Sequence, residues 1–209
     1  MSHARFDDAA REALTNCVRE IEKTSDAELV LIVRARSGSY RHADYLFGSI
    51  LAFAGLNFLL FSPVSFQVYW VAIDVAVLFV LGTLLSSRSK TIRYLFSRKR
   101  HRNEAVRTGA ATMFYEAGIA NTEAEMGVLV YLSLLERRLE LIADRGVLKG
   151  VPALDWNQVL FELHQAGKKP EPETLLKGLR GLGNLLTQHL PATGENPNEL
   201  PDMPRFELK

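Results

Sequence analysis

Residues 45–63 read YLFGSILAFAGLNFLLFSP, and residues 68–87 read VYWVAIDVAVLFVLGTLLSS. Each stretch has about the 20 apolar residues that an α-helix needs to cross a bilayer. Only the four residues VSFQ separate them. The pattern therefore predicts a transmembrane helical hairpin over residues 43–87.

Charge is distributed unequally around this hairpin. The connecting loop, residues 62–67, has no charged side chain, whereas Arg34, Arg36 and Arg41 precede the hairpin. Seven basic residues follow it in a juxtamembrane segment, residues 88–103, and are expected to contact anionic lipid headgroups: Arg88, Lys90, Arg93, Arg98, Lys99, Arg100 and Arg102. Because positive residues stay on the cytoplasmic side, we expect a multi-pass protein of the inner (plasma) membrane with both termini cytoplasmic.

The overall composition argues against other classes of protein. A buried hairpin in a soluble protein would also be apolar, but 209 residues with a mean hydropathy of +0.00 supply too little chain to bury it. The net charge of +1 argues against a general nucleic-acid-binding protein. The lone Cys17 cannot form an intramolecular disulfide, which agrees with a cytoplasmic domain.

Outside the hairpin, the periodicity predicts an α/β domain. Helices are expected at residues 5–23, 104–118, 156–165 and 173–189, and strands at residues 27–35, 127–133 and 138–143. The first two strands are expected to be parallel, joined by a crossover into which the hairpin is inserted, and the third to be antiparallel to the second. The predicted parts are residues 1–42, 43–87, 88–103, 104–190 and a disordered tail, 191–209.

Three segments resemble the TPM-domain family. Residues 22–33, EKTSDAELVLIV, are similar to its opening helix and strand, and residues 125–133 and 136–147, EMGVLVYLS and ERRLELIADRGV, to its second and third strands. The resemblance implies a three-layer Rossmann-like sandwich with a small mixed sheet, found in thylakoid-lumen photosystem-repair proteins and bacterial envelope proteins. Some members are assigned phosphatase activity or calcium binding. The chain has Glu125-Met126-Gly127 for the family's Asp-Asn-Gly, and Asp144-Arg145-Gly146 for its Gly-x-Gly.

Acidic residues gather at one predicted edge of the sheet. They are Asp26, Glu123, Glu125 and Asp144, at the ends of three strands. Converging carboxylates suit Ca²⁺ or Mg²⁺, which take oxygen ligands, and could position a water molecule for hydrolysis. The alternative is that these side chains are simply solvated.

The opposite edge combines basic and hydroxyl side chains. Glu136, Arg137 and Arg138 follow the second strand, and Arg36, Ser37 and Ser39 follow the first. An anion or a lipid phosphate could bind there. The alternative is a set of surface salt bridges, which contribute little to stability.

Two polar residues interrupt the apolar stretches. Asp74 lies in the second span and Asn57 in the first, so we expect a hydrogen bond between them within the membrane. Small residues at helical spacing are expected to bring the two helices close together: Gly48, Ala52, Gly55, Ala72 and Ala76.

These features favour a non-enzymatic scaffold, or an assembly or maintenance factor, for another membrane protein. The alternative is a metal-assisted phosphatase that uses the acidic edge. The five histidines, His3, His42, His101, His164 and His189, fall in no metal-binding spacing, and the sequence has no phosphate-binding loop. Carboxylates without an evident nucleophile favour the scaffold.

Overall fold

The computed structural model describes residues 6–63, 67–194, 199–200 and 203–208. The chain divides into two compact units. The first, the α/β unit, comprises Met1–Ser37 and Asn103–Lys209, and the second, the hairpin unit, comprises Gly38–Arg102. Each unit is described by itself.

The α/β unit is built on a four-stranded mixed sheet with the order β3-β2-β1-β4. The strands are β1 (Glu28–Arg34), β2 (Gly127–Ser133), β3 (Arg138–Ala143) and β4 (Arg205–Glu207). β1 is parallel to β2 and to β4, and β2 is antiparallel to β3. The prediction of three strands with these directions is confirmed, and β4 is an addition.

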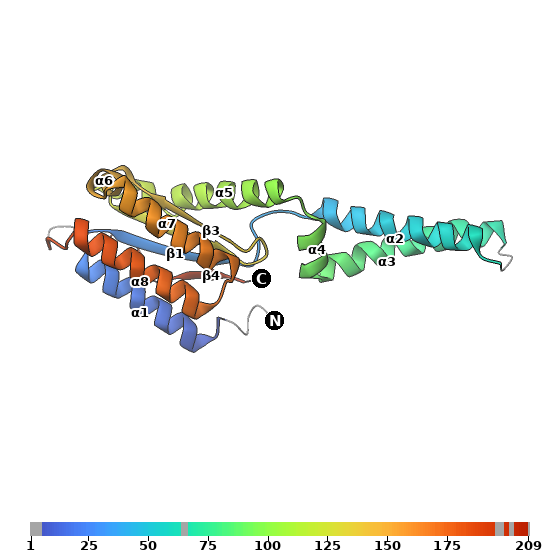
Figure 1. Cartoon of the computed structure of the whole chain (residues 1–209), viewed down its shortest axis with the longest axis horizontal. Coiled ribbons are helices and arrows are strands. Elements are labelled where there is room, and N and C mark those ends of the chain that lie inside the picture. The colour runs from blue at the N-terminus through green and yellow to red at the C-terminus, as the bar shows by residue number, and fades with distance from the viewer. Residues whose placement is uncertain (1–5, 64–66, 195–198, 201–202, 209) are drawn as a thin grey trace. The chain divides into compact units, whose positions relative to one another are not determined.

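Helices cover both faces of this sheet (Figure 1). They are α1 (Asp8–Thr24), α5 (Lys99–Glu116), α6 (Arg145–Gly150), α7 (Ala153–Lys168), α8 (Pro172–His189) and the 3-10 helix η1 (Ile119–Asn121). Leu29 and Leu31 of β1 pack into the core formed with α1, α7 and α8, whereas Val30 and Ile32 pack into the core formed with α5. A strand buried on both faces needs apolar residues at every position, which explains the continuous apolar run in β1.

The C-terminal segment is packed against the sheet, so the prediction of a disordered tail is wrong for its described residues. Ile32, Val33 and Arg34 of β1 pair with β4, and Leu208 is buried in the core. Near its start, the backbone N–H of Ala192 donates to the carbonyl of Thr24. The composition rich in Pro, Asn and Glu suggested disorder, but the free edge of β1 accepts a strand. Residues 195–198, 201–202 and 209 lie outside the described residues.

The hairpin unit consists of α2 (Arg41–Phe61), α3 (Val68–Arg88) and α4 (Lys90–Phe96). The helices α2 and α3 are long and apolar enough to cross a membrane, with mean hydropathies of 1.6 and 2.0 over their apolar stretches. The short helix α4 lies in the predicted juxtamembrane segment. Residues 64–66 of the predicted connecting loop lie outside the described residues.

Glycines allow α2 and α3 to pack closely. A Cβ atom at Gly48 would lie 2.4 Å from Thr83 Oγ1, and one at Gly82 would lie 2.9 Å from the Cα of Gly48. Ala52 is buried and a Cβ at Gly55 would meet Leu78, so the small residues of α2 lie where they were expected. Ala72 and Ala76 of α3 are exposed instead, because they lie to one side of the α3 face that packs on α2.

Candidate functional site

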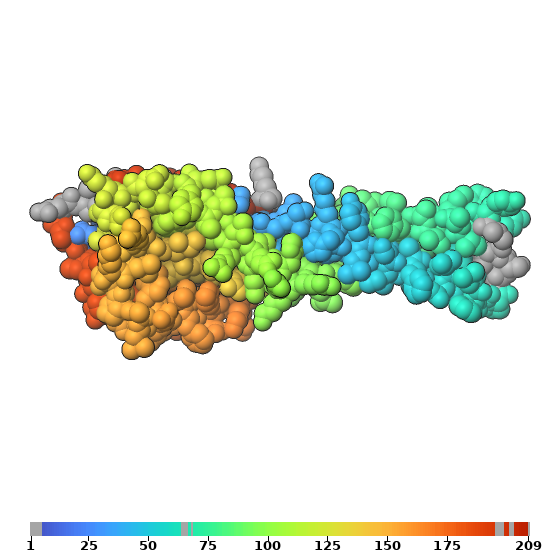
Figure 2. All heavy atoms as spheres, turned by 90° about the horizontal axis from the view of Figure 1, so that it is seen from above, coloured from blue at the N-terminus to red at the C-terminus, as the bar shows by residue number. Residues whose placement is uncertain are grey.

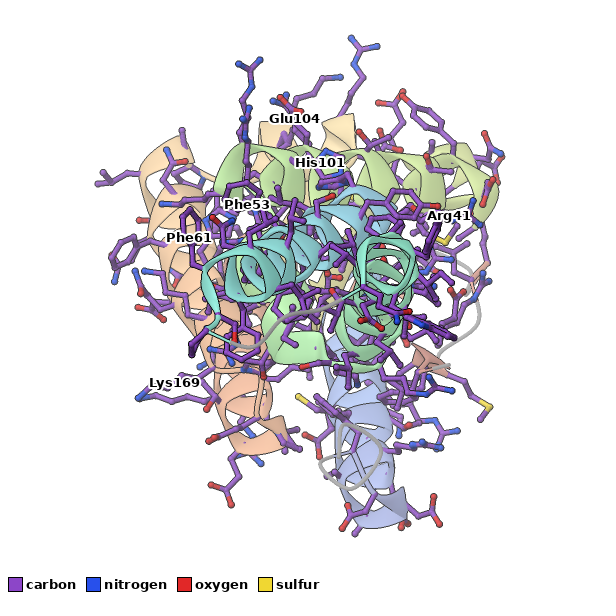
Figure 3. The ribbon with its side chains drawn as sticks, turned by 90° about the vertical axis from the view of Figure 1, so that its right-hand side faces the viewer. Arg41, Phe53, Phe61, His101, Glu104 and Lys169 are labelled. Atoms are coloured by element: carbon purple, nitrogen blue, oxygen red, sulfur yellow. The ribbon has the colours of Figure 1, made fainter. Side chains whose placement is uncertain are left out.

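Figure 2 draws the atoms of α2 and α3 that form the outer surface of the hairpin. The exposed side chains of this surface are strongly apolar. Only 17% of the apolar stretch of α2 and 11% of that of α3 is buried. Phe53 and Phe61, labelled in Figure 3, point outward and are 68% and 83% exposed. Exposed apolar surface of this extent marks a membrane or protein contact rather than a surface made for water.

Aromatic side chains concentrate at the loop end of the hairpin. Phe61 ends α2, and Tyr69 and Trp70 lie in the first turn of α3, where both are more than half exposed. Tyr and Trp are enriched at membrane–water interfaces because they combine an apolar ring with a polar group. This end of the hairpin therefore has the composition of an interfacial belt.

A buried ion pair lies at the other end of the hairpin. Asp44, in the first turn of α2, is 4% exposed. Its carboxylate accepts hydrogen bonds from Arg93 Nε at 3.0 Å, Arg93 Nη2 at 2.8 Å and Ser86 Oγ at 2.7 Å. The two-point arginine contact fixes the orientation of the guanidinium plane. Asp44 thereby ties the start of α2 to the end of α3 and to α4.

Two of the seven residues predicted to contact lipid headgroups have partners within the hairpin unit. Arg93 is bound by Asp44, and Arg102 donates to the carbonyl of Tyr94 at 2.7 Å, with its guanidinium 4.1 Å from the centre of the Tyr94 ring. Both arginines therefore serve the packing of the hairpin unit. The other five predicted lipid contacts are exposed: Arg88, Lys90, Arg98, Lys99 and Arg100.

Asp44 was not predicted as a functional residue. Its pairing with Arg93 could have been predicted, because an acidic residue at the start of one span and a basic residue just after the next lie near the same end of an antiparallel hairpin. Asp44 is buried, which makes an unpaired charge there costly.

The predicted hydrogen bond between Asn57 and Asp74 is not formed in the described part of the hairpin. Asn57 Nδ2 donates to the carbonyl of Phe53 in its own helix at 2.8 Å. Nine residues, or about two and a half turns, separate Asn57 from Gly48, so Asn57 lies on the face of α2 opposite the α3 contact. The Asp74 side chain is partly exposed on the flank of α3.

Internal hydrogen bonds occupy much of the predicted acidic edge. Both oxygens of Asp26 accept from Thr193, through its backbone N–H at 2.9 Å and its hydroxyl at 2.8 Å. Asp144 is the N-cap of α6 and accepts from the N–H of Arg145. Glu123 and Glu125 are exposed. Among the described residues, no group of three or more His, Cys, Asp or Glu side chains could hold a metal ion.

The opposite edge contains a chain of hydrogen bonds at the ends of the parallel strands β1 and β2. The Ser37 hydroxyl contacts the Tyr131 hydroxyl at 2.9 Å and the Ser133 hydroxyl at 2.8 Å. Ser133 donates to Glu136, whose carboxylate also accepts from the N–H of Ser37 at 2.9 Å. Glu136 is therefore an acceptor that fixes Ser37, the last residue before the hairpin unit.

This arrangement does not assemble the predicted anion site. The Glu136 carboxylate points at the hydroxyl groups, and Arg138 is paired with Glu140 on its own strand at 2.6 Å. Arg36, Ser39 and Arg137 are exposed. Tyr131 and Ser133 were not predicted to take part in this network, because they lie in an apolar run that indicated only a buried strand.

Burial shifts the pKa values of two side chains in the α/β unit. Burial raises the pKa of the Cys17 thiol, which keeps it protonated within the core contact between α1 and the sheet. Burial lowers the pKa of His164 on α7, which favours the neutral imidazole. Neither effect creates a pair of catalytic groups.

Comparison with known proteins supports the fold alone. No family model matches the chain, and no curated protein matches it. The chain is similar to the NMR structure of the BA42 protein from the psychrophilic bacterium Bizionia argentinensis sp. nov., with a TM-score of 0.58 and 13% sequence identity. The match covers 96% of this chain and 94% of that one. Together with the four-stranded sheet, it shows a mixed α/β protein.

Proposed function

We propose that this chain is an integral protein of the inner (plasma) membrane, anchored by α2 and α3, with both termini in the cytoplasm. The observation that carries the proposal is the apolar, mostly unburied surface of two consecutive helices of 21 residues each. Burying that surface in lipid removes a large area from water at about 25 cal/mol per Å². The five exposed basic residues at the end of α3 and after it would then lie among anionic headgroups on the cytoplasmic side.

The α/β unit in this proposal is a three-layer Rossmann-like domain of the TPM type. The helices on both faces of the sheet and the segments at residues 22–33 and 125–147 support this assignment. The hairpin would be an insertion in the crossover from β1 to β2, and the chain order of β1, α2, α3, α5 and β2 supports this.

The function we propose is that of a non-enzymatic scaffold, or an assembly or maintenance factor, for another membrane protein. Both carboxylate oxygens of Asp26 and of Glu136, and one oxygen of Asp144, accept hydrogen bonds from within the protein. Asp74, by contrast, places a partly exposed carboxyl group on an apolar span. Such a group is costly in lipid and is ordinarily paired with a neighbouring helix. A partner span with a hydrogen-bond donor would relieve this cost.

Site-specific photo-crosslinking in cells tests this function. A crosslinker at Val77 lies on the same flank of α3 as Asp74, and one at Ala76 lies toward the other flank. We expect Val77 to crosslink to a discrete membrane protein and Ala76 to do so less. The Val77 product should be lost in Asp74→Leu and largely kept in Asp74→Asn. Crosslinks to lipid alone would contradict the scaffold function.

The hydrolase alternative has its own test. A phosphatase assay with added calcium or magnesium should give no activity above background in the detergent-purified protein. Activity that is lost in Asp144→Asn and Glu125→Gln would replace the scaffold with the metal-assisted hydrolase.

A further inference from the structure

Two histidines from distant parts of the chain meet within the hairpin unit. His42 lies in the first turn of α2, and His101, labelled in Figure 3, lies in the first turn of α5. Their ring centres are 4.8 Å apart with an interplanar angle of 88°. Both side chains are exposed and therefore accessible from solution.

We propose that His42 and His101 together bind a divalent transition-metal ion. Metal–nitrogen bonds of about 2.0–2.1 Å place each ring centre about 3 Å from the ion, so two rings bound at about 100° have centres about 5 Å apart. The observed separation of 4.8 Å agrees with that spacing. Imidazole nitrogen is a preferred ligand of Zn²⁺, Cu²⁺ and Ni²⁺, whereas Ca²⁺ and Mg²⁺ prefer oxygen.

The buried ring of Tyr40 packs against both histidine rings. Tyr40 is 1% exposed, and its ring centre lies 6.2 Å from that of His42 and 5.9 Å from that of His101. Its ring meets His101 edge-on at 88°, an arrangement that aromatic pairs favour. The two imidazoles are thus held near each other before any ion binds, which lowers the entropy cost of binding.

The site offers two protein ligands and leaves other coordination positions open. Since the described residues contain no group of three or more His, Cys, Asp or Glu ligands, water or a small ligand would complete the coordination. Open positions are typical of exchangeable or catalytic metal sites, whereas structural zinc sites have four protein ligands. A bound ion would link the helix that begins the hairpin to the segment that follows it.

Neighbouring charges limit the affinity. Arg41 adjoins His42, and Arg100 and Arg102 adjoin His101. The Arg102 guanidinium lies against the Tyr94 ring. Positive charges disfavour a dication, although solvent screens exposed groups. Cu²⁺ is therefore the best probe, because it binds nitrogen sites most tightly in the first-row series.

The test uses the full-length, tag-free protein in detergent or nanodiscs with added Cu²⁺. Pulsed electron paramagnetic resonance counts the imidazoles bound to the ion. We expect two in the wild type, one in His42→Asn or His101→Asn, and at least a tenfold weaker affinity in either variant. His189→Asn in the α/β unit is the matched control and should leave the count and affinity unchanged.

The wild-type spectrum is decisive without any variant. A single bound imidazole would overturn the proposal. No binding by the folded protein at 100 μM copper would overturn it too; a dissociation constant of that size corresponds to a binding free energy of about −5.5 kcal/mol. Equal copper affinity in the wild type and both single variants would overturn it as well. Thermal unfolding without metal confirms that the exposed substitutions leave the fold intact.

Discussion

The two units use the same apolar residue types for opposite purposes. In the α/β unit, Val30 and Ile32 lie between the sheet and α5 and are almost completely buried. In the hairpin unit, Ile73, Val77 and Val80 are about half exposed. The first set is removed from water by the protein itself, whereas the second is suited to removal by lipid. Apolar content alone therefore does not distinguish a core from a membrane surface, but the arrangement of secondary structure does.

Buried carboxylates show the same contrast. Glu28 in the α/β unit accepts hydrogen bonds from the backbone N–H groups of Glu199 and Leu200 at 3.0 and 2.9 Å. Asp44 in the hairpin accepts side-chain donors, Arg93 and Ser86. The donors to Asp44 lie on α3 and α4, whose backbone N–H groups at these positions are used within the helices, so only side chains are available. Loops beside a sheet still have backbone donors to offer.

The largest expected effect comes from separating the two units. Replacing residues 38–102 with a Gly/Ser linker should move the protein completely from the membrane fraction to the soluble fraction. Because the α/β unit has its own cores, the soluble product should unfold cooperatively in denaturant. Circular dichroism and sedimentation measure both outcomes. A product that stays in the membrane, or that lacks a cooperative transition, would contradict the division into two units.

Matched truncations compare a core with a lipid-facing surface. Leu31→Ala in β1 should lower the unfolding free energy of the α/β unit by about 2–5 kcal/mol, because Leu31 is buried. Val77→Ala on α3 should change the unfolding free energy of the hairpin unit by less than about 0.5 kcal/mol. Chemical denaturation in detergent measures the difference. Similar losses in both variants would show that Val77 is buried.

Removing Asp44 should weaken the hairpin. Asp44→Ala leaves Arg93 without its carboxylate partner, and breaking a buried pair costs about 3 kcal/mol. Thermal unfolding of the hairpin unit in detergent should show this loss. Replacing Arg93 with Met in the same variant should restore much of the stability, because no unpaired charge remains. No rescue in the double variant would indicate that the pair acts by more than charge compensation.

The smallest effect concerns pH. Because burial lowers the pKa of His164 in the folded state, the unfolded chain takes up a proton at a higher pH than the folded chain. The α/β unit should therefore keep its stability above about pH 6.5, the ordinary histidine pKa, and lose some as the pH falls below it. His164→Gln should reduce this decline between pH 7.5 and pH 5.5. An unchanged pH dependence of the melting temperature would exclude His164 as its source.

Much of the fold could be predicted because its signals are local. The bounds of β2 and β3 agree with the apolar runs in the sequence, and α2 and α3 agree with the two long apolar stretches. β4 could not be predicted in this way, since Arg205–Glu207 form a strand only when the edge of β1 is available. Composition suggested disorder in that segment because it carries no information about the tertiary partner of the strand.

The polar sites were harder to predict because their partners are distant in the chain. Asp26 was expected to join other carboxylates, but Thr193 supplies its hydrogen bonds. Asn57 was expected to reach Asp74, but helix rotation places it on the wrong face. The His42 and His101 pair had no recognisable spacing, because the whole hairpin lies between its members. Sequence position predicts such contacts only after the topology is known.

We propose that the hairpin crosses the membrane with its loop on the far side and both termini in the cytoplasm, and thiol labelling tests this topology most directly. The experiment uses a Cys17→Ala background with a single cysteine at Gln67, beside the loop, or at Ser39, before α2. Intact cells are treated with an impermeant thiol reagent. Where the cells have an outer membrane, it is permeabilised first. Both positions are exposed in the structure. With this topology, the cysteine at position 67 should react at once and the one at position 39 should react only after lysis. The reverse pattern, or protection of both positions until lysis, would contradict it.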